Sequence, residues 1–285
     1  MRTITTVREM QMIALRLKRE GKSIGFVPTM GYLHEGHLSL LKAARKENDV
    51  TVLSIFVNPL QFGPKEDLAT YPRDFDRDSK LAEQERNDFI FYPSADEMYP
   101  GTLSVTARVQ DRTDVLCGKS RPGHFDGVAT VLTKLFNIIQ PDKVYFGMKD
   151  AQQVAVVGGL VKDFNFPVEI VAVGTVREAD GLAKSSRNIN LLPAERVEAP
   201  ALNQSLKIAE SKIIEGEEDP LEIIAQVRGH IEKNTTGHID YVEILSYPDL
   251  KELDRLEGTI IIAIAVKFTK VRLIDNVIIT INKGS

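Results

Sequence analysis

Short apolar runs alternate with amphipathic stretches over the first 173 residues of the chain. Runs rich in β-branched and aromatic residues predict buried strands at 24–27, 50–57, 88–92, 143–146 and 168–173. Between them, apolar positions at helical spacing predict helices at 7–19, 38–46, 74–87, 128–139 and 151–164. Residues 105–109 alternate like a half-exposed strand. This order of strands and helices predicts an α/β fold with a parallel sheet.

The pattern changes in the last third of the chain. Helical spacing predicts helices at 193–215 and 220–234, and apolar runs then predict strands at 239–245, 259–266 and 271–281. Helices followed by antiparallel strands are typical of a smaller α+β unit. We therefore expect two domains, at 1–176 and 177–285.

Composition narrows the class of protein. Of the 285 residues 43% are hydrophobic and 27% are charged, and the net charge is −4, which argues against a nucleic-acid binder. The longest apolar run, 260–266, is too short to span a bilayer. Cys117 has no second cysteine to pair with, and we expect it to be a small buried side chain. The sequence therefore predicts a cytoplasmic protein without a membrane segment.

The stretch 27–39 carries the first chemical signal. It leads from a predicted strand into a predicted helix through Gly31 and Gly36, with His34 and His37 three residues apart. Backbone N–H groups at a helix start, together with imidazole donors, are suited to a phosphate group. A surface turn or half of a metal site are the alternatives at this point.

Three further stretches carry polar residues where strands end. Asn58 and Gln61 follow the second predicted strand, and Lys149 follows another at the start of a helix. Ligands of open α/β sheets bind beyond the carboxyl ends of the strands. Arg177, Lys184 and Arg187 lie in a hydroxyl-rich segment that either closes over a nucleotide or is a solvated linker. The basic, glycine-rich loop 119–127 is either another anion site or a solvated loop.

Taken in order, these motifs resemble the pantothenate synthetase (pantoate–β-alanine ligase) family over essentially the whole chain. The motifs are Pro28-Thr-Met-Gly-Tyr-Leu-His-Glu-Gly-His-Leu-Ser39, Phe56-Val-Asn-Pro-Leu-Gln-Phe62, Tyr71-Pro-Arg73, Arg121-Pro-Gly-His-Phe-Asp-Gly127, Lys134-Leu-Phe-Asn137, Tyr145-Phe-Gly-Met-Lys-Asp-Ala-Gln-Gln153, Arg177-Glu-Ala-Asp-Gly181, Ser185-Ser-Arg-Asn188 and Arg272-Leu-Ile-Asp-Asn276. Each motif is weak by itself, but all of them in one order are specific.

The resemblance implies a Rossmann-like amino-terminal domain, a smaller carboxyl-terminal lid and a homodimer. It implies that ATP, (R)-pantoate and β-alanine give pantothenate, AMP and diphosphate through a pantoyl adenylate, with Mg²⁺ carried by the ATP phosphates rather than by protein ligands. No nucleic acid or membrane partner is implied.

The resemblance also implies site residues, carried over position by position. An ATP site would comprise Met30, Gly31, Tyr32, Leu33, His34, Glu35, Gly36, His37, Gly147, Met148, Lys149, Asp150, Val176, Lys184, Ser185, Ser186 and Arg187. Catalytic roles at the phosphates would fall on His34, His37, Lys149, Ser186 and Arg187, with His37 as the proton donor. Pantoate and β-alanine would be bound by Met30, Asn58, Gln61 and Gln153.

Two positions depart from the family pattern. Lys184 stands where Met or Leu is common, and it either adds a cation beside ATP or points to solvent. Asp74 replaces a usual Thr, and both residues cap helices well. The alternatives are another His-x-Gly-His nucleotidyltransferase and a non-catalytic nucleotide-binding protein.

Overall fold

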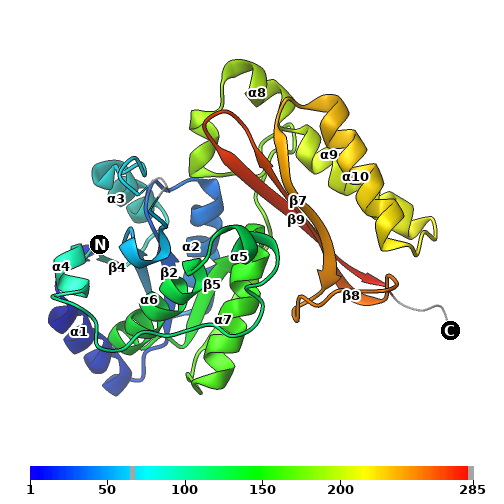
Figure 1. Cartoon of the computed structure of the whole chain (residues 1–285). Helices are drawn as coiled ribbons and strands as arrows, with labels where there is room; N and C mark the ends of the chain where they lie inside the picture. Colours follow the sequence, from blue (N-terminus) through cyan, green and yellow to red (C-terminus); the bar gives the residue numbers. More distant parts are fainter. Residues whose placement is uncertain (65–67, 282–285) are drawn as a thin grey trace. The chain divides into compact units, whose positions relative to one another are not determined.

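The computed structural model describes residues 1–64 and 68–281, and the chain divides into two compact units (Figure 1). The parallel-sheet unit comprises Met1–Thr113, Gly118–Met148 and Val156–Gly174. The antiparallel-sheet unit comprises Asp114–Cys117, Lys149–Ala155 and the chain from Thr175 onward. Each unit has its own sheet.

Six strands form the sheet of the first unit, and every adjacent pair is parallel. They are β1 (Arg2–Ile4), β2 (Ile24–Thr29), β3 (Val50–Ile55), β4 (Phe89–Phe91), β5 (Lys143–Gly147) and β6 (Glu169–Val173), in the order β1-β4-β3-β2-β5-β6. The chain adds strands on one side of β2 and then returns to its other side at β5. The carboxyl ends of β2 and β5 thus flank the switch point where such sheets bind ligands.

Helices connect these strands. They are α1 (Val7–Arg19), α2 (Glu35–Glu47), α3 (Phe75–Gln84), α4 (Ala95–Met98), α5 (Leu116–Ser120), α6 (His124–Ile139) and α7 (Ala151–Asp163), with short 3-10 turns η1 (Pro59–Gln61) and η2 (Met148–Asp150). Helix α2 packs on β2, β3 and β5, where Leu41 meets a core that includes Val27, Leu53 and Ile90. The helix that follows β2 is therefore fixed on the centre of the sheet.

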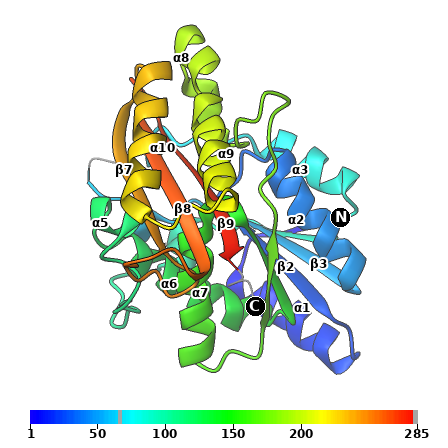
Figure 2. The same ribbon diagram turned by 90° about the vertical axis from the view of Figure 1, so that its right-hand side faces the viewer.

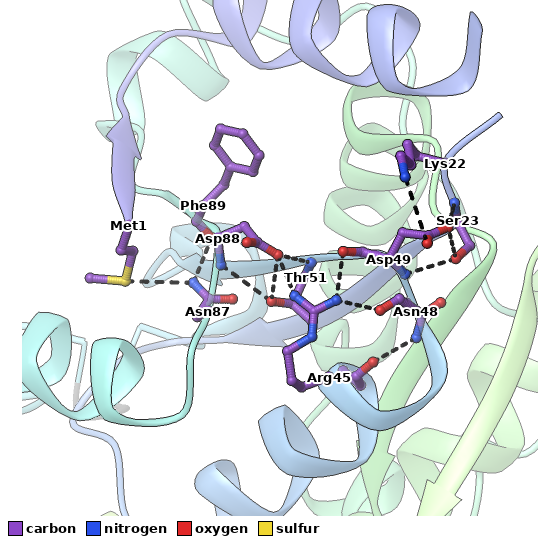
Figure 3. Close-up of polar contacts among 11 residues, drawn as sticks. Met1, Lys22, Ser23, Arg45, Asn48, Asp49, Thr51, Asn87, Asp88 and Phe89 are labelled. Carbon is purple, nitrogen blue, oxygen red and sulfur yellow. Dashed lines mark hydrogen bonds and ion pairs between the residues drawn. The ribbon is translucent and has the colours of Figure 1, made fainter. Parts of the chain in front are cut away.

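A polar network fixes the amino ends of the strands (Figure 3). Arg45 of α2 donates to the Asp88 carboxylate at 2.6 Å and to the carbonyls of Asn48 and Asp49. Asp88 also accepts from the Thr51 N–H at 2.8 Å. Because β3 begins at Val50 and β4 at Phe89, this network lies at the edge opposite the strands' carboxyl ends.

The second unit has a sheet of three antiparallel strands, β7 (His238–Ser246), β8 (Gly258–Lys267) and β9 (Arg272–Ile281), in that order. Its other elements are η3 (Ser186–Asn190), α8 (Pro193–Glu198), α9 (Ala201–Ile214) and α10 (Pro220–Asn234). Figure 2 shows α9 and α10 side by side along this sheet. Their apolar faces, with Leu206 and Val227, share a core with Ile262 and Leu273.

The structure confirms the predicted α/β fold with a separate α+β region, but two element predictions were wrong, and α2 and α6 begin earlier than predicted. Residues 105–109 form no strand, because the N–H groups of Ala107 and Val109 donate to side chains of α6 at 3.0 and 2.7 Å. The helix expected at 193–215 is two helices, because Pro200 has no N–H to continue the first. Helix α2 begins at Glu35, which brings His37 into its first turn.

The sequence prediction also missed β1, α4 and α5, which are three to five residues long. Elements of this length contain too few positions to show a period. Among residues 1–64 and 68–281, no helix is long and apolar enough to cross a membrane.

Candidate active site

A buried carboxylate accepts backbone hydrogen bonds from the turn after β2. Asp78 of α3 is 1% exposed, and it accepts the N–H of Tyr32 at 2.6 Å and the N–H of Leu33 at 2.7 Å. Burial raises the pKa of Asp78, and these two hydrogen bonds oppose that shift. A Cβ on Gly31 would lie 2.9 Å from Ile55 and 3.0 Å from Asp78, so this position requires glycine. Tyr32 itself has a φ of 52°.

Two imidazoles cap the helix that follows. His34 is the N-cap of α2, and its Nδ1 accepts the N–H of Gly36 at 3.1 Å. Nδ1 of His37 in turn accepts the N–H of His34 at 3.3 Å, and the ring centroids are 4.1 Å apart. Because both Nδ1 atoms are acceptors, this network assigns both rings to the neutral form with the proton on Nε2.

Backbone N–H groups of the turn have partners within the protein. The N–H groups of Gly31, Tyr32, Leu33, His34 and Gly36 all donate within the protein. The sequence had suggested that backbone N–H groups of this turn would meet a phosphate. The N–H groups of His34 and Gly36 meet the imidazoles. Those of Gly31, Tyr32 and Leu33 meet the side chains of Thr29 and Asp78. In this network the proton of each neutral ring is on Nε2.

Asn58, Gln61 and Met30 form one contact group in the same unit. Asn58 is 1% exposed and donates from Nδ2 to Gln61 Oε1 at 3.2 Å and to the carbonyl of Gly127 at 3.0 Å. The Gln61 amide donates to Met30 Sδ at 3.3 Å. The hydroxyl of Tyr99 donates to Asn58 Oδ1 at 2.8 Å, and burial raises the pKa of Tyr99. The structure thus brings together three residues that the sequence assigned to pantoate and β-alanine.

Part of the loop 119–127 packs against this group, whereas residues 119, 120, 122 and 123 are exposed. His124 Nδ1 donates to the Gln61 carbonyl at 2.8 Å, and His124 Nε2 accepts from Arg121 at 3.0 Å. Gly127 lies so close to η1 that a Cβ there would be 2.4 Å from the Leu60 carbonyl oxygen. Arg121, His124 and Gly127 therefore fix the backbone at Gln61.

The segment after β5 supplies the next predicted residues. Gly147 ends β5 and Met148 begins η2, both in the parallel-sheet unit, and Lys149 begins the part of this segment that belongs to the other unit. Lys149 is 3.6 Å from the Asp150 carboxylate and its side chain is 21% exposed. Its carbonyl accepts the side-chain amide of Asn276 at 2.9 Å.

The two adjacent glutamines of α7 have different environments. Gln152 is 6% exposed, accepts the N–H of Cys117 at 2.9 Å and donates to the Val115 carbonyl at 2.9 Å. Gln153 is only partly buried. Gln152 is therefore committed to the protein interior, which leaves Gln153 as the glutamine of this pair suited to a substrate.

The predicted nucleotide loop is a short hairpin in the antiparallel-sheet unit. The Lys184 N–H donates to the Val176 carbonyl at 2.9 Å, and Arg177 pairs with Ala183. The hairpin leads into η3, where the Ser185 hydroxyl accepts the N–H of Arg187 at 3.3 Å. Ser186 is 8% exposed.

The environments of Lys184 and Cys117 can be compared with what the sequence led us to expect. The Lys184 side chain is 19% exposed and lies 2.7 Å from Glu178, so it does not point to solvent. Cys117 is buried, as expected, but it is not surrounded only by apolar atoms. Its sulfur is 3.3 Å from the Tyr241 hydroxyl and 3.4 Å from Arg272.

Asp78, Tyr99, His124 and Asn276 were not predicted from the sequence as site residues. Asp78 lies in an amphipathic helix on the apolar side, beside Ala82, and that position was the available signal. His124 lay within a quoted motif, but its partner is a carbonyl 63 residues away, which no local pattern shows.

Comparisons with known proteins agree with this arrangement. The model of the pantoate-beta-alanine ligase family matches residues 2–278. A pantothenate synthetase of Geobacillus kaustophilus is 63% identical over 277 residues, which are 97% of this chain and 92% of the relative. That of Geobacillus thermodenitrificans is 61% identical over 281 residues, 99% of this chain and 97% of the relative.

Comparison with solved structures indicates the same family. Pantothenate synthetase from Thermus thermophilus has a TM-score of 0.92 at 44% identity, covering 97% of this chain and 99% of that one. Pantoate-beta-alanine ligase from Francisella tularensis, complexed with beta-gamma ATP and beta-alanine, has a TM-score of 0.79 at 34% identity over 97% of each chain. The chain therefore belongs to the pantoate–beta-alanine ligase family, and its activity is the ATP-dependent ligation of pantoate to β-alanine.

Proposed function

We propose that the ligation proceeds in two steps through a pantoyl adenylate. In the first step a carboxylate oxygen of (R)-pantoate attacks the α-phosphorus of ATP in line, and diphosphate leaves. In the second step the neutral amine of β-alanine attacks the pantoyl carbonyl carbon. The new C–N bond forms, the bond to AMP breaks, and the amine gives up a proton. Adenylation is needed because an unmodified carboxylate would have to expel oxide.

His34 and His37 serve the phosphates in this proposal. The observation that carries the assignment is the pair of Nδ1 acceptors, because they orient each ring and leave the proton on Nε2. Donors held in place before the reaction stabilise the charge that builds on the phosphate oxygens. His37 donates from Nε2 as the negative charge develops.

In this proposal Lys149, Ser186 and Arg187 act at the same phosphates. We propose that Gly147, Met148, Asp150, Val176, Lys184 and Ser185 complete the ATP site, together with residues 30–37. The Lys184 ammonium already has a carboxylate partner in Glu178. We therefore expect Lys184 to contribute through its backbone more than through its charge.

Gln61 and Gln153 select the acid in this proposal, with Asn58 and Met30 beside Gln61. The contacts among Met30, Asn58 and Gln61 support this role, because they hold the Gln61 amide in one orientation. Residues 1–176 would act as the catalytic domain and 177–285 as a lid that keeps water from the adenylate.

Magnesium is proposed to arrive bound to the ATP phosphates. Within residues 1–64 and 68–281 no three His, Cys, Asp or Glu side chains lie close enough to hold a metal ion, and no step is assigned to a protein-bound ion. We further propose a homodimer in the cytoplasm. The lone Cys117, which needs no oxidising compartment, supports the location, and sedimentation velocity tests the dimer.

The first test measures AMP release from ATP with pantoate and β-alanine omitted in turn. We expect no steady AMP release without both, and pantothenate in an amount equal to AMP. Steady AMP release that needs a different acceptor would indicate another His-x-Gly-His nucleotidyltransferase. Absence of AMP under every combination would indicate a non-catalytic nucleotide-binding protein.

The second test addresses the residue roles. His37→Ala and Lys149→Ala should each lower the adenylation rate by roughly 10²–10³-fold, by analogy with loss of an oxyanion donor. Gln153→Ala should chiefly raise the KM for pantoate, whereas Gln152→Ala should chiefly lower thermal stability, because Gln152 is bonded to Cys117 and Val115. Near-normal turnover in His37→Ala would refute its role at the phosphates.

A further inference from the structure

Two adjacent polar side chains of β9 are buried among apolar strands. Asp275 is 3% exposed and Asn276 is 9% exposed, and β9 pairs with the apolar strand β8 along its whole length. Asp and Asn are poor strand residues. Buried polar groups in proteins are hydrogen-bonded, so the partners of these two side chains show what they do.

Asp275 holds the hairpin that precedes Ser185. Its carboxylate accepts hydrogen bonds from both terminal nitrogens of Arg177, at 2.6 and 3.0 Å. Arg177 also donates to the Gly181 carbonyl at 3.2 Å. The base of the hairpin is thereby attached to β9, and the segment that continues into Ser186 and Arg187 starts from a fixed point.

Asn276 holds the turn that carries Lys149. Its Nδ2 donates to the Lys149 carbonyl at 2.9 Å, across 127 positions of sequence. The backbone N–H of Asn276 donates to Asp275 Oδ1 at 2.8 Å, so Asp275 binds both Arg177 and the backbone of Asn276. Lys149 lies in η2, a single 3-10 turn, and such a turn has few internal hydrogen bonds to fix its backbone.

We propose that Asn276 is a positioning residue for the adenylation step and acts through the backbone of Lys149. This inference rests on the proposed role of Lys149 at the ATP phosphates. Asn276 touches no substrate in this scheme. It keeps the Cα of Lys149 at a fixed distance from the strand that also holds Arg177, so that the ammonium group reaches the phosphates in one geometry. A displacement of about 1 Å at such a group can lower a rate by about 100-fold.

The test is a double-mutant cycle between Asn276→Ala and Lys149→Ala. We expect Asn276→Ala to lower kcat for AMP release by about 10-fold to 100-fold, with little change in the KM for pantoate. In the Lys149→Ala background the same substitution should change kcat by less than about twofold, because the group it positions is already gone. Asn276→Ser, which keeps a hydroxyl donor and removes less volume, repeats the cycle if the Ala variant does not fold.

Ser205→Ala is the matched control. Ser205 is fully buried in α9 of the same unit and donates to the Leu202 carbonyl at 2.7 Å, so its loss also removes a buried hydrogen bond to a carbonyl. We expect this control to leave kcat unchanged both in the wild type and in the Lys149→Ala variant.

Two outcomes overturn the inference, and they differ. If Lys149→Ala lowers kcat and Asn276→Ala lowers it by the same further factor in both backgrounds, Asn276 has only a general structural role. If Lys149→Ala has nearly wild-type kcat, the proposed role of Lys149 is wrong and the positioning inference is refuted with it.

Discussion

Asp78→Asn tests whether the buried carboxylate under the His turn organises the site. The substitution keeps the shape of the side chain but leaves only one acceptor oxygen. In the wild type Oδ2 accepts the Tyr32 N–H at 2.6 Å and Oδ1 accepts the Leu33 N–H at 2.7 Å. In the variant one of these N–H groups faces an amide NH₂ instead.

The expected loss follows from these two bonds. A buried N–H left without an acceptor costs about 1–3 kcal/mol, and the remaining bond weakens by about 1 kcal/mol when its acceptor becomes neutral. Part of this loss in stability is offset, because the variant removes a buried charge. The raised pKa of Asp78 reflects the cost of burying that charge. We therefore expect a net loss of about 2 kcal/mol in the free energy of unfolding, or a Tm lower by about 4–8 °C.

The same substitution should also reduce catalysis. Tyr32 has a φ of 52°, a conformation that non-glycine residues rarely adopt, and Asp78 is what holds it. When the turn relaxes, the backbone that carries His34 moves, and kcat for AMP release should fall by at least about 10-fold.

The assays are urea unfolding and steady-state AMP release. Asp76→Asn is the control, since Asp76 is exposed in the first turn of the same helix and undergoes the same chemical change. A variant at position 78 that matches this control within about 0.5 kcal/mol, with wild-type kcat, would refute the reasoning.

Two further predictions concern packing and pH. Gly127→Ala should lower stability by about 1–3 kcal/mol and raise the KM for pantoate, because the new Cβ would lie 2.4 Å from the Leu60 carbonyl oxygen beside Gln61. The control is Gly158→Ala, in open space on α7, which should leave stability at or above wild type and the KM unchanged. Thermal unfolding and kinetic assays measure both variants. Equal effects of the two glycine substitutions would contradict this. Hydrogen bonds from Lys143 and Tyr145 lower the pKa of Glu47 below its ordinary 4.5, so the stability that Glu47 contributes is present above that pH and is lost as pH falls below it. The difference in free energy of unfolding between wild type and Glu47→Gln should therefore shrink from pH 6 to pH 3, and a constant difference across that range would show that the carboxylate charge is not responsible.

Much of the fold follows from the sequence alone. The apolar runs near 24–27, 50–57 and 143–146 are strands because β-branched side chains buried on both faces of a parallel sheet leave a continuous apolar signal. The helical periods of α1, α7 and α10 gave their bounds closely, since one face of each helix must meet a core. The motifs were read in order along the chain, and their order was enough to indicate the family.

The tertiary structure decided which polar groups are available for chemistry. The sequence does not show that Asp78 takes the Tyr32 and Leu33 N–H groups, or that Asn276 holds Lys149. The family resemblance selected Gln153 for pantoate, but only the structure shows that its neighbour Gln152 is turned inward and bonded to Cys117. These pairings join residues from 35 to 127 positions apart. A hydrogen bond depends on where two segments meet in space, whereas local periodicity reports only which side of each segment is apolar.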